Sequence, residues 1–171
     1  MSTETDAART AGGRRRYQLP EHAVTFEDPL ADLDEPNLRR LYEYWDAARR
    51  GRPMPARADI DPVEFGWALG NLSLIDVLPD GRFRWRLDGT NIVDFFRCDM
   101  TGKELDAYPH ADAVGRMREN FGKAVETRAP HYFVSRYDTD RRSWRYQTLV
   151  LPLSDDGETV NMLLQMLAAC R

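Results

Sequence analysis

The sequence predicts an α+β domain in which helices cover one face of a five-stranded antiparallel sheet, with an amphipathic helix ahead of the sheet. Three observations predict this class. Helical spacing of apolar residues comes first, two strand-like segments then precede a long helical crossover, and three further strand-like segments complete the chain. The loops between these last segments are short and rich in turn formers, which is typical of an antiparallel meander.

Length and composition indicate one globular domain. The chain has 171 residues, of which 42% are hydrophobic and 30% charged, and its net charge is −4. Nucleic-acid binders usually carry a strongly basic face, so we expect no nucleic-acid partner. The chain has two cysteines, and no motif has metal-site spacing, so we expect no metal. Neither a signal peptide nor an apolar run of roughly 18 residues is found, so we expect a cytoplasmic protein without membrane contact.

Residues 1–31 are expected to form a disordered tail, because they are polar and show no sustained periodicity. The domain then occupies residues 32–171. Within the tail, the arginines at 14–16 are interpreted as solvated sequence or as an arm that contacts an acidic partner.

An amphipathic helix is predicted over 36–50. Pro36 suits the first helical turn, and the acids before it suit the positive end of the helix dipole. The residues that follow with helical spacing form an apolar stripe: Leu38, Leu41, Tyr42 and Trp45. A second, short helix is predicted over 61–69, with Asp61 as its cap.

Two strands are predicted over 72–78 and 82–88, separated by a Pro-Asp-Gly turn. The second strand alternates strictly, so we expect one face to be covered and the other to be wet or in an interface. The covered face would carry Phe83, Trp85 and Leu87; the other would carry Arg82, Arg84, Arg86 and Asp88, near Arg145 and Gln147. Asp76 lies in the first, mostly apolar strand. Its carboxylate is expected to bond a loop or an arginine, or to contact a ligand.

An irregular crossover follows over 89–108 and contains an apolar patch with Ile92, Val93, Phe95 and Phe96. A long helix is predicted over 111–127, with Phe121 on its apolar stripe. Gly115 and Gly122 lie on nearly the same side of that helix, which suggests that something approaches them closely. The last three strands are predicted over 131–137, 143–151 and 160–167.

At this point the sequence resembles a PAS domain, and more closely a bacterial family of small, often stand-alone PAS-like proteins. The resemblance runs from about Asn37 to Ala169. It is carried by the segments LYEYW at 41–45, GRPMPARADIDP at 51–62, LIDV at 74–77, RWRLDGT at 84–90, DMTG at 99–102 and LPLSDDG at 151–157.

The resemblance implies a sheet of strand order 2-1-5-4-3, a pocket between the inner face of the sheet and the crossover helices, and a signalling role. The family often has Gly-Arg where this chain has Arg97-Cys98. A flavin adduct would need a cysteine near Leu105, and haem would need a histidine such as His110 on the long helix. Cys98 lies before the required turn and His110 only at the helix start, so we expect neither flavin nor haem.

We expect a non-enzymatic sensor that binds a small organic ligand, a protein partner or both, forms a homodimer, and carries no output domain in this chain. The same residues also fit a filled core without a ligand. The pocket candidates are Phe83, Trp85, Leu87, Phe95, Phe96, Gly115, Gly122, Phe121, Trp144, Tyr146 and Met162. The dimer-interface candidates are Leu38, Leu41, Tyr42 and Trp45. The alternatives are a small α+β enzyme with Asp76 or His131 as acid or base, and a structural dimerisation or adaptor module.

Overall fold

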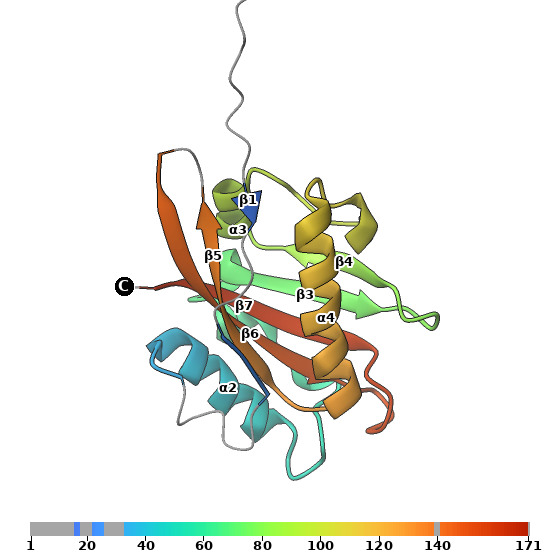
Figure 1. Ribbon diagram of the computed structural model, residues 1–171. Coiled ribbons are helices and arrows are strands. Elements are labelled where there is room, and N and C mark those ends of the chain that lie inside the picture. The colour runs from blue at the N-terminus through green and yellow to red at the C-terminus, as the bar shows by residue number, and fades with distance from the viewer. Residues whose placement is uncertain (1–15, 18–21, 26–32, 139–140, 171) are drawn as a thin grey trace, which may run out of the picture.

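The central element is one antiparallel sheet. A computed structural model describes residues 16–17, 22–25, 33–138 and 141–170. Within this part, the strands lie in the order β1-β5-β6-β7-β3-β4, and β2 also pairs with β5 (Figure 1); β1 is Arg16–Tyr17 and β2 is His22–Thr25. The main strands are β3 (Leu72–Val77), β4 (Phe83–Asp88), β5 (His131–Asp138), β6 (Ser143–Leu153) and β7 (Met162–Ala169). When these five strands are numbered one to five along the chain, their order in the sheet is 2-1-5-4-3, which confirms the predicted sheet.

The α-helices of the described residues are α2 (Pro36–Ala48), α3 (Thr90–Phe96) and α4 (Ala111–Thr127). Short 3-10 turns η1 (Arg57–Asp59), η2 (Pro62–Phe65), η3 (Leu69–Asn71) and η4 (Leu105–Ala107) join them. The short helix predicted over 61–69 is therefore only a 3-10 turn. Asp61 does cap it, accepting the Val63 N–H at 2.9 Å, but Gly66 follows at once and disfavours a longer helix.

Two short strands precede the predicted domain boundary. β1 (Arg16–Tyr17) and β2 (His22–Thr25) both pair antiparallel with β5. These strands fall in the segment predicted to be a disordered tail. Strand pairing uses backbone groups, so two strands this short leave no periodicity in the sequence. The rest of the predicted tail, including Arg14 and Arg15, lies outside the described residues.

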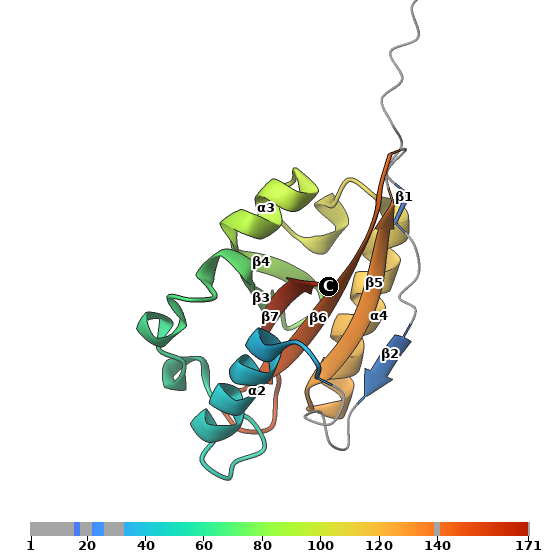
Figure 2. The same cartoon turned by 90° about the vertical axis from the view of Figure 1, so that its left-hand side faces the viewer.

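Helices cover both faces of the sheet. On the inner face, the ring of Phe121 in α4 packs against Phe83 and Trp85, with centroids 5.3 and 5.7 Å away. On the opposite face, α2 packs against β6 and β7, and the Trp45 indole donates a hydrogen bond to the Pro152 carbonyl at 2.9 Å. Figure 2 shows α2 and α4 on opposite sides of the strands. Consequently, β6 is buried on both faces from Tyr146 onward.

A β-bulge in β4 breaks the alternation that the sequence suggested. Leu74 pairs with Leu87, but Ile75 pairs with Trp85, so Arg86 is the extra residue. The bulge turns Leu87 to the outer surface, where its side chain is 42% exposed, and turns Asp88 inward, where it is buried. The predictions that Leu87 shares the covered face and that Asp88 shares the outer one are therefore wrong.

Candidate functional site

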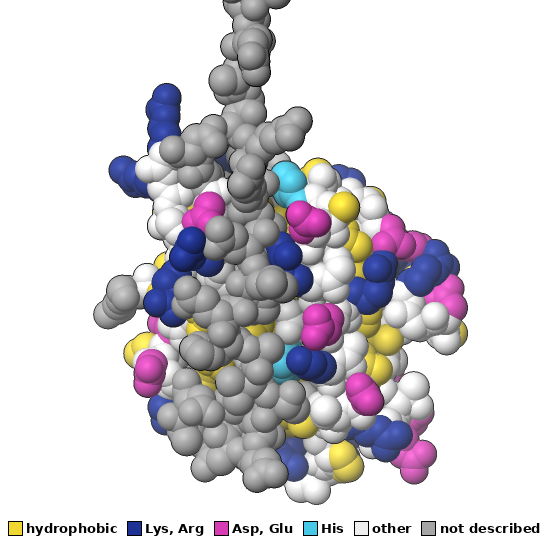
Figure 3. All heavy atoms as spheres, in the orientation of Figure 1, with side chains coloured by type: hydrophobic (Ala, Val, Ile, Leu, Met, Phe, Trp, Pro, Cys, Tyr) yellow, Lys and Arg dark blue, Asp and Glu magenta, His cyan; other side chains and the backbone are white. Residues whose placement is uncertain are grey.

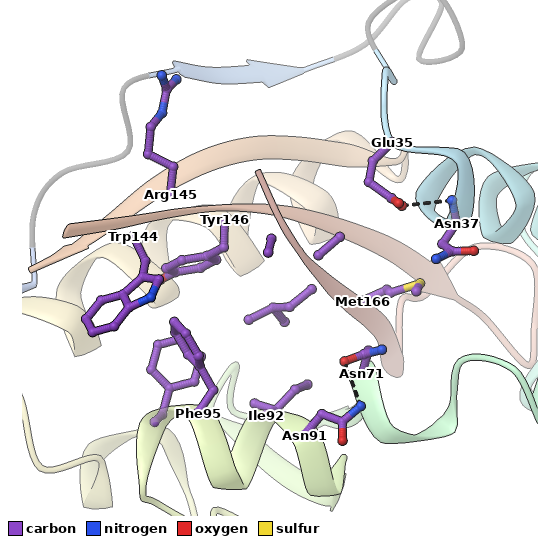
Figure 4. Close-up of a pocket in the computed structure, with 14 residues that line it drawn as sticks. Glu35, Asn37, Asn71, Asn91, Ile92, Phe95, Trp144, Arg145, Tyr146 and Met166 are labelled. Carbon is purple, nitrogen blue, oxygen red and sulfur yellow. Dashed lines mark hydrogen bonds between the residues drawn. The ribbon is translucent and has the colours of Figure 1, made fainter. Parts of the chain in front are cut away.

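The candidate site is a cavity of about 410 Å³ at the edge of the sheet where β7 ends. It lies between α3, the first residues of β6, the final residues of β7, the turn η3 and the start of α2 (Figure 4). β3 pairs with β7 only as far as Leu72 opposite Met166. Beyond that point β7 continues to Ala169 without β3 beside it, and this leaves the space that the cavity occupies.

Aromatic side chains form one wall of the cavity. Phe95 of α3 meets Trp144 of β6 edge to face, with ring centroids 5.9 Å apart, and Phe96 meets Tyr146 in the same way at 5.5 Å. Such pairs hold each other in defined positions. Phe95 is nevertheless 39% exposed, so the wall has an open apolar surface. Leu167 and Ile92 also line this part.

Amide side chains form the opposite end. The Asn91 Nδ2 group donates to Asn71 Oδ1 at 3.2 Å, which links α3 to η3. Asn37 and Glu35, at the start of α2, complete this end (Figure 4). The Glu35 carboxylate accepts the N–H groups of Asn37 and Leu38 at 2.8 and 2.9 Å, and it thereby caps the helix.

The interior between the sheet and α4 is closely packed. Phe121 is fully buried, and its ring packs against Phe83 and Trp85. A small interior space of about 50 Å³ lies beside these rings, bordered by Trp85, Met117 and Phe133 among others. The packing of Phe121 favours the filled core, one of the two interpretations that the sequence left open for the inner face.

This interior does contain a buried acid. The Asp88 carboxylate accepts the Ser73 hydroxyl at 2.7 Å and the Met100 N–H at 3.4 Å. Burial raises the pKa of Asp88 above its ordinary value, although these hydrogen bonds act in the opposite direction. The burial of Asp88 could not be predicted from the sequence, because it depends on the bulge in β4.

The structure brings four predicted pocket residues together in the edge cavity: Phe95, Phe96, Trp144 and Tyr146. Trp85 borders the small interior space, with Phe83 and Phe121 packed against one another beside it, and Met162 is buried in the core. A Cβ atom placed on Gly115 or Gly122 would meet no described atom of a neighbouring element within 4 Å. The close approach that these two glycines suggested is therefore absent among the described residues. The residues that reasoning from sequence missed are Asn71, Asn91 and the end of β7, which carry no local signal.

The proposed dimer stripe on α2 is covered by the chain itself. Leu38 and Leu41 are fully buried and Trp45 is 3% exposed, so these three cannot contact a second copy while α2 lies on the sheet. Tyr42 is half-buried and stacks on Trp45 at 6.2 Å. The helix α2 is amphipathic because its apolar stripe packs against the sheet of the same chain. The homodimer itself remains a prediction.

The acid and base of the enzyme alternative do not lie at the cavity. Asp76 binds Arg84 and Arg86 at 3.0 and 2.9 Å on the outer face, which is the arginine contact that the sequence analysis expected. His131 is fully buried, with its Nε2 2.9 Å from Asn120 Oδ1. The two side chains lie in β3 and β5, with β6 and β7 between those strands.

The candidate cofactor ligands are placed as follows. Cys98 borders the small interior space, is half-buried, and has a pKa raised by burial, as in an unreactive thiol. His110 precedes α4 and contacts Tyr108. Among the described residues no three His, Cys, Asp or Glu side chains are grouped as metal ligands.

The family model for the PAS domain matches residues 33–168. The chain belongs to the PAS domain family. The domain is thus a sensory or signalling module, of a class that often mediates dimerisation and protein interaction. No curated protein and no solved structure matches it. In the described part of the chain, no helix has the length and hydrophobicity needed to cross a membrane.

Proposed function

We propose that this PAS domain is a non-catalytic sensor that binds a small organic molecule with an aromatic or other flat apolar group in the edge cavity. The observation that carries the proposal is the cavity's aromatic wall. Its volume of about 410 Å³ falls within the range of small-molecule sites, roughly 300 to 1,000 Å³, while the small interior space beside Trp85 has about 50 Å³.

The position of the cavity supports a signalling role. Glu35 is the N-cap of α2 and Asn37 lies in its first turn, and both line the same space as Phe95 and Trp144. A bound molecule therefore touches α2, the helix that covers the outer face of the sheet. Occupancy that shifts α2 would change the surface offered to a partner protein or to a second copy of the chain.

The charge distribution agrees with a protein partner. Figure 3 shows acidic and basic side chains interspersed over the face that carries α4. Just before β4, Arg82 forms ion pairs with Asp80 and Glu104. On the outer face of β4, Arg84 and Arg86 both pair with Asp76. Such a surface does not have the unbroken basic stripe of a nucleic-acid binder.

Native mass spectrometry of the purified protein tests the proposal. We expect a small molecule retained from the cell, or indole added as a probe, to remain bound to the wild type and to be lost from Trp144→Ala. Trp67→Ala is the matched control, because Trp67 stacks under Arg40 at 4.3 Å and does not line the cavity. If indole binds both variants equally, or does not bind the wild type, the site assignment is wrong.

A further inference from the structure

The end of β7 presents backbone hydrogen-bonding groups to the cavity. In an antiparallel sheet, the backbone groups of successive residues point alternately to the two neighbouring strands. The Cys170 N–H donates to the Arg145 carbonyl of β6 at 2.9 Å, and the Val77 N–H of the β3 side donates to the Asn161 carbonyl at 3.0 Å. Even-numbered residues at this end of β7 therefore pair with β6, and odd-numbered residues point to the β3 side.

Leu167 and Ala169 are the odd-numbered residues beyond the last pair of β3 and β7, which is Leu72 with Met166. Their N–H and C=O groups point into the space that β3 leaves open, and both residues line the cavity. A donor and an acceptor from each of two residues thus lie along one side of the site. A ligand that covers these groups removes their water, so they favour a ligand that forms hydrogen bonds with them.

The amide pair at the polar end adds a second set of such groups. The Asn91 Nδ2 to Asn71 Oδ1 bond uses one donor and one acceptor, and each side chain has further amide groups beside the cavity. Figure 4 places this pair across the cavity from Phe95 and Trp144. The site therefore has an apolar aromatic end and an end with both donors and acceptors.

The charges around the cavity favour a neutral molecule. The Glu35 carboxylate is engaged by the backbone of α2, and the Arg145 side chain points away from the cavity (Figure 4). Among the described residues that line the cavity, no guanidinium is directed at the position of a carboxylate ligand. A neutral group that both donates and accepts hydrogen bonds matches the wall that Leu167 and Ala169 provide.

We infer that the ligand of this cavity is a neutral carboxamide joined to an aromatic group, with the amide alongside β7 and the ring against Phe95 and Trp144. This inference rests on the proposed function, since it names the chemistry of the molecule that the same cavity binds. The carboxamide pairs with the open strand edge in the way that an added strand does, through one donor and one acceptor.

Isothermal titration calorimetry of the full chain with three indole probes tests the inference. The probes are 3-methylindole, the methyl ester of indole-3-propionic acid, and indole-3-propionamide. We expect the amide to bind about tenfold more tightly than the ester, because the ester lacks the N–H donor. Equal affinities of amide and ester would overturn the carboxamide assignment while leaving the cavity as a ligand site. Failure of all three probes to bind would overturn the proposed function as well.

The variant Ala169→Pro locates the contact. Proline removes the N–H of residue 169, which points to the open edge and takes no part in pairing with β6. We expect the affinity for the amide to fall several-fold, with the affinity for 3-methylindole unchanged. An unchanged amide affinity in Ala169→Pro would place the amide elsewhere, and the comparison of amide with ester in the wild type stands whether or not this variant folds.

Discussion

At the scale of single residues, Gly89 matters for close packing, whereas Gly115 and Gly122, to which helical spacing drew attention, do not. A Cβ on Gly89 would lie 2.4 Å from the Gly70 carbonyl oxygen and 2.7 Å from the Leu72 oxygen, both of them backbone atoms that cannot turn away. Gly89 also connects β4 to α3, so it positions the helix that carries Phe95.

Gly89→Ala should therefore lower the free energy of unfolding by about 2 to 3 kcal/mol, the usual cost of overpacking. Gly115→Ala is the control, because that position lies inside α4 with open space around it; it should gain up to about 1 kcal/mol from helix propensity. Urea unfolding of both variants measures the two changes. A Gly89→Ala variant as stable as the wild type would contradict the packing described for α3.

Asp88 predicts an unusual dependence of stability on pH. Burial raises the pKa of Asp88 in the folded chain, so the folded state holds this proton more tightly than the unfolded state does. The contribution of Asp88 to stability is thus greatest below about pH 4 and is lost as the pH rises through the folded pKa. The free energy of unfolding of the wild type, relative to Asp88→Asn, should fall as the pH rises from 4 to 7.

Asp156 provides the opposite case and serves as the control. The backbone N–H groups of Thr159 and Glu158, at 2.6 and 2.8 Å, hold the pKa of its carboxyl well below the usual range. The advantage of the wild type over Asp156→Asn should be present at pH 7 and be lost as the pH falls below about 4. If the difference in free energy of unfolding between wild type and variant changed with pH in the same direction for Asp88→Asn and Asp156→Asn, the opposite pKa shifts of the two carboxyl groups would be contradicted.

At the scale of elements, α3 ends in a conformation that its sequence does not favour. Arg97 has φ of 55°, in the left-handed region where glycine is preferred. The strain lies at the end of the helix that forms one wall of the cavity.

Arg97→Gly should raise the free energy of unfolding by up to about 1 kcal/mol, because it relieves the left-handed strain at a small cost in chain entropy. Arg118→Gly, inside α4, should instead lower it by about 1 kcal/mol. Thermal unfolding of the two variants distinguishes the effects. If Arg97→Gly lowered the free energy of unfolding, the contacts of the Arg97 side chain would stabilise the fold by more than its left-handed backbone conformation destabilises it.

The elements were predictable where one local pattern determines them. Alternation identified β4, and the proline and acids ahead of residue 38 identified α2, because each pattern depends only on neighbours in sequence. The bulge at Arg86 was not predictable, since it depends on the register between β3 and β4. The aromatic wall was partly predicted from the apolar patch at 92–96, whereas Asn71 and Leu167 join the site only through the sheet topology.

At the scale of the whole molecule, the fold separates a filled interior from an open edge. Phe121 closes the space beneath α4, and the shortness of β3 relative to β7 opens a cavity at the sheet edge. That cavity touches α2, which lies on the opposite face from α4 (Figure 2). The central claim is that ligands bind at this edge and not beneath α4.

Two-dimensional ¹H–¹⁵N NMR of the full chain titrated with indole tests this claim most directly. We predict that the backbone amides that shift most are those of Asn91 to Phe96, Trp144 to Tyr146 and Leu167 to Ala169, together with Asn37 in α2. The amides of Phe83, Trp85 and Phe121 should shift least. Shifts that centre on these last three residues, or the absence of any shift at saturating indole, would contradict the account.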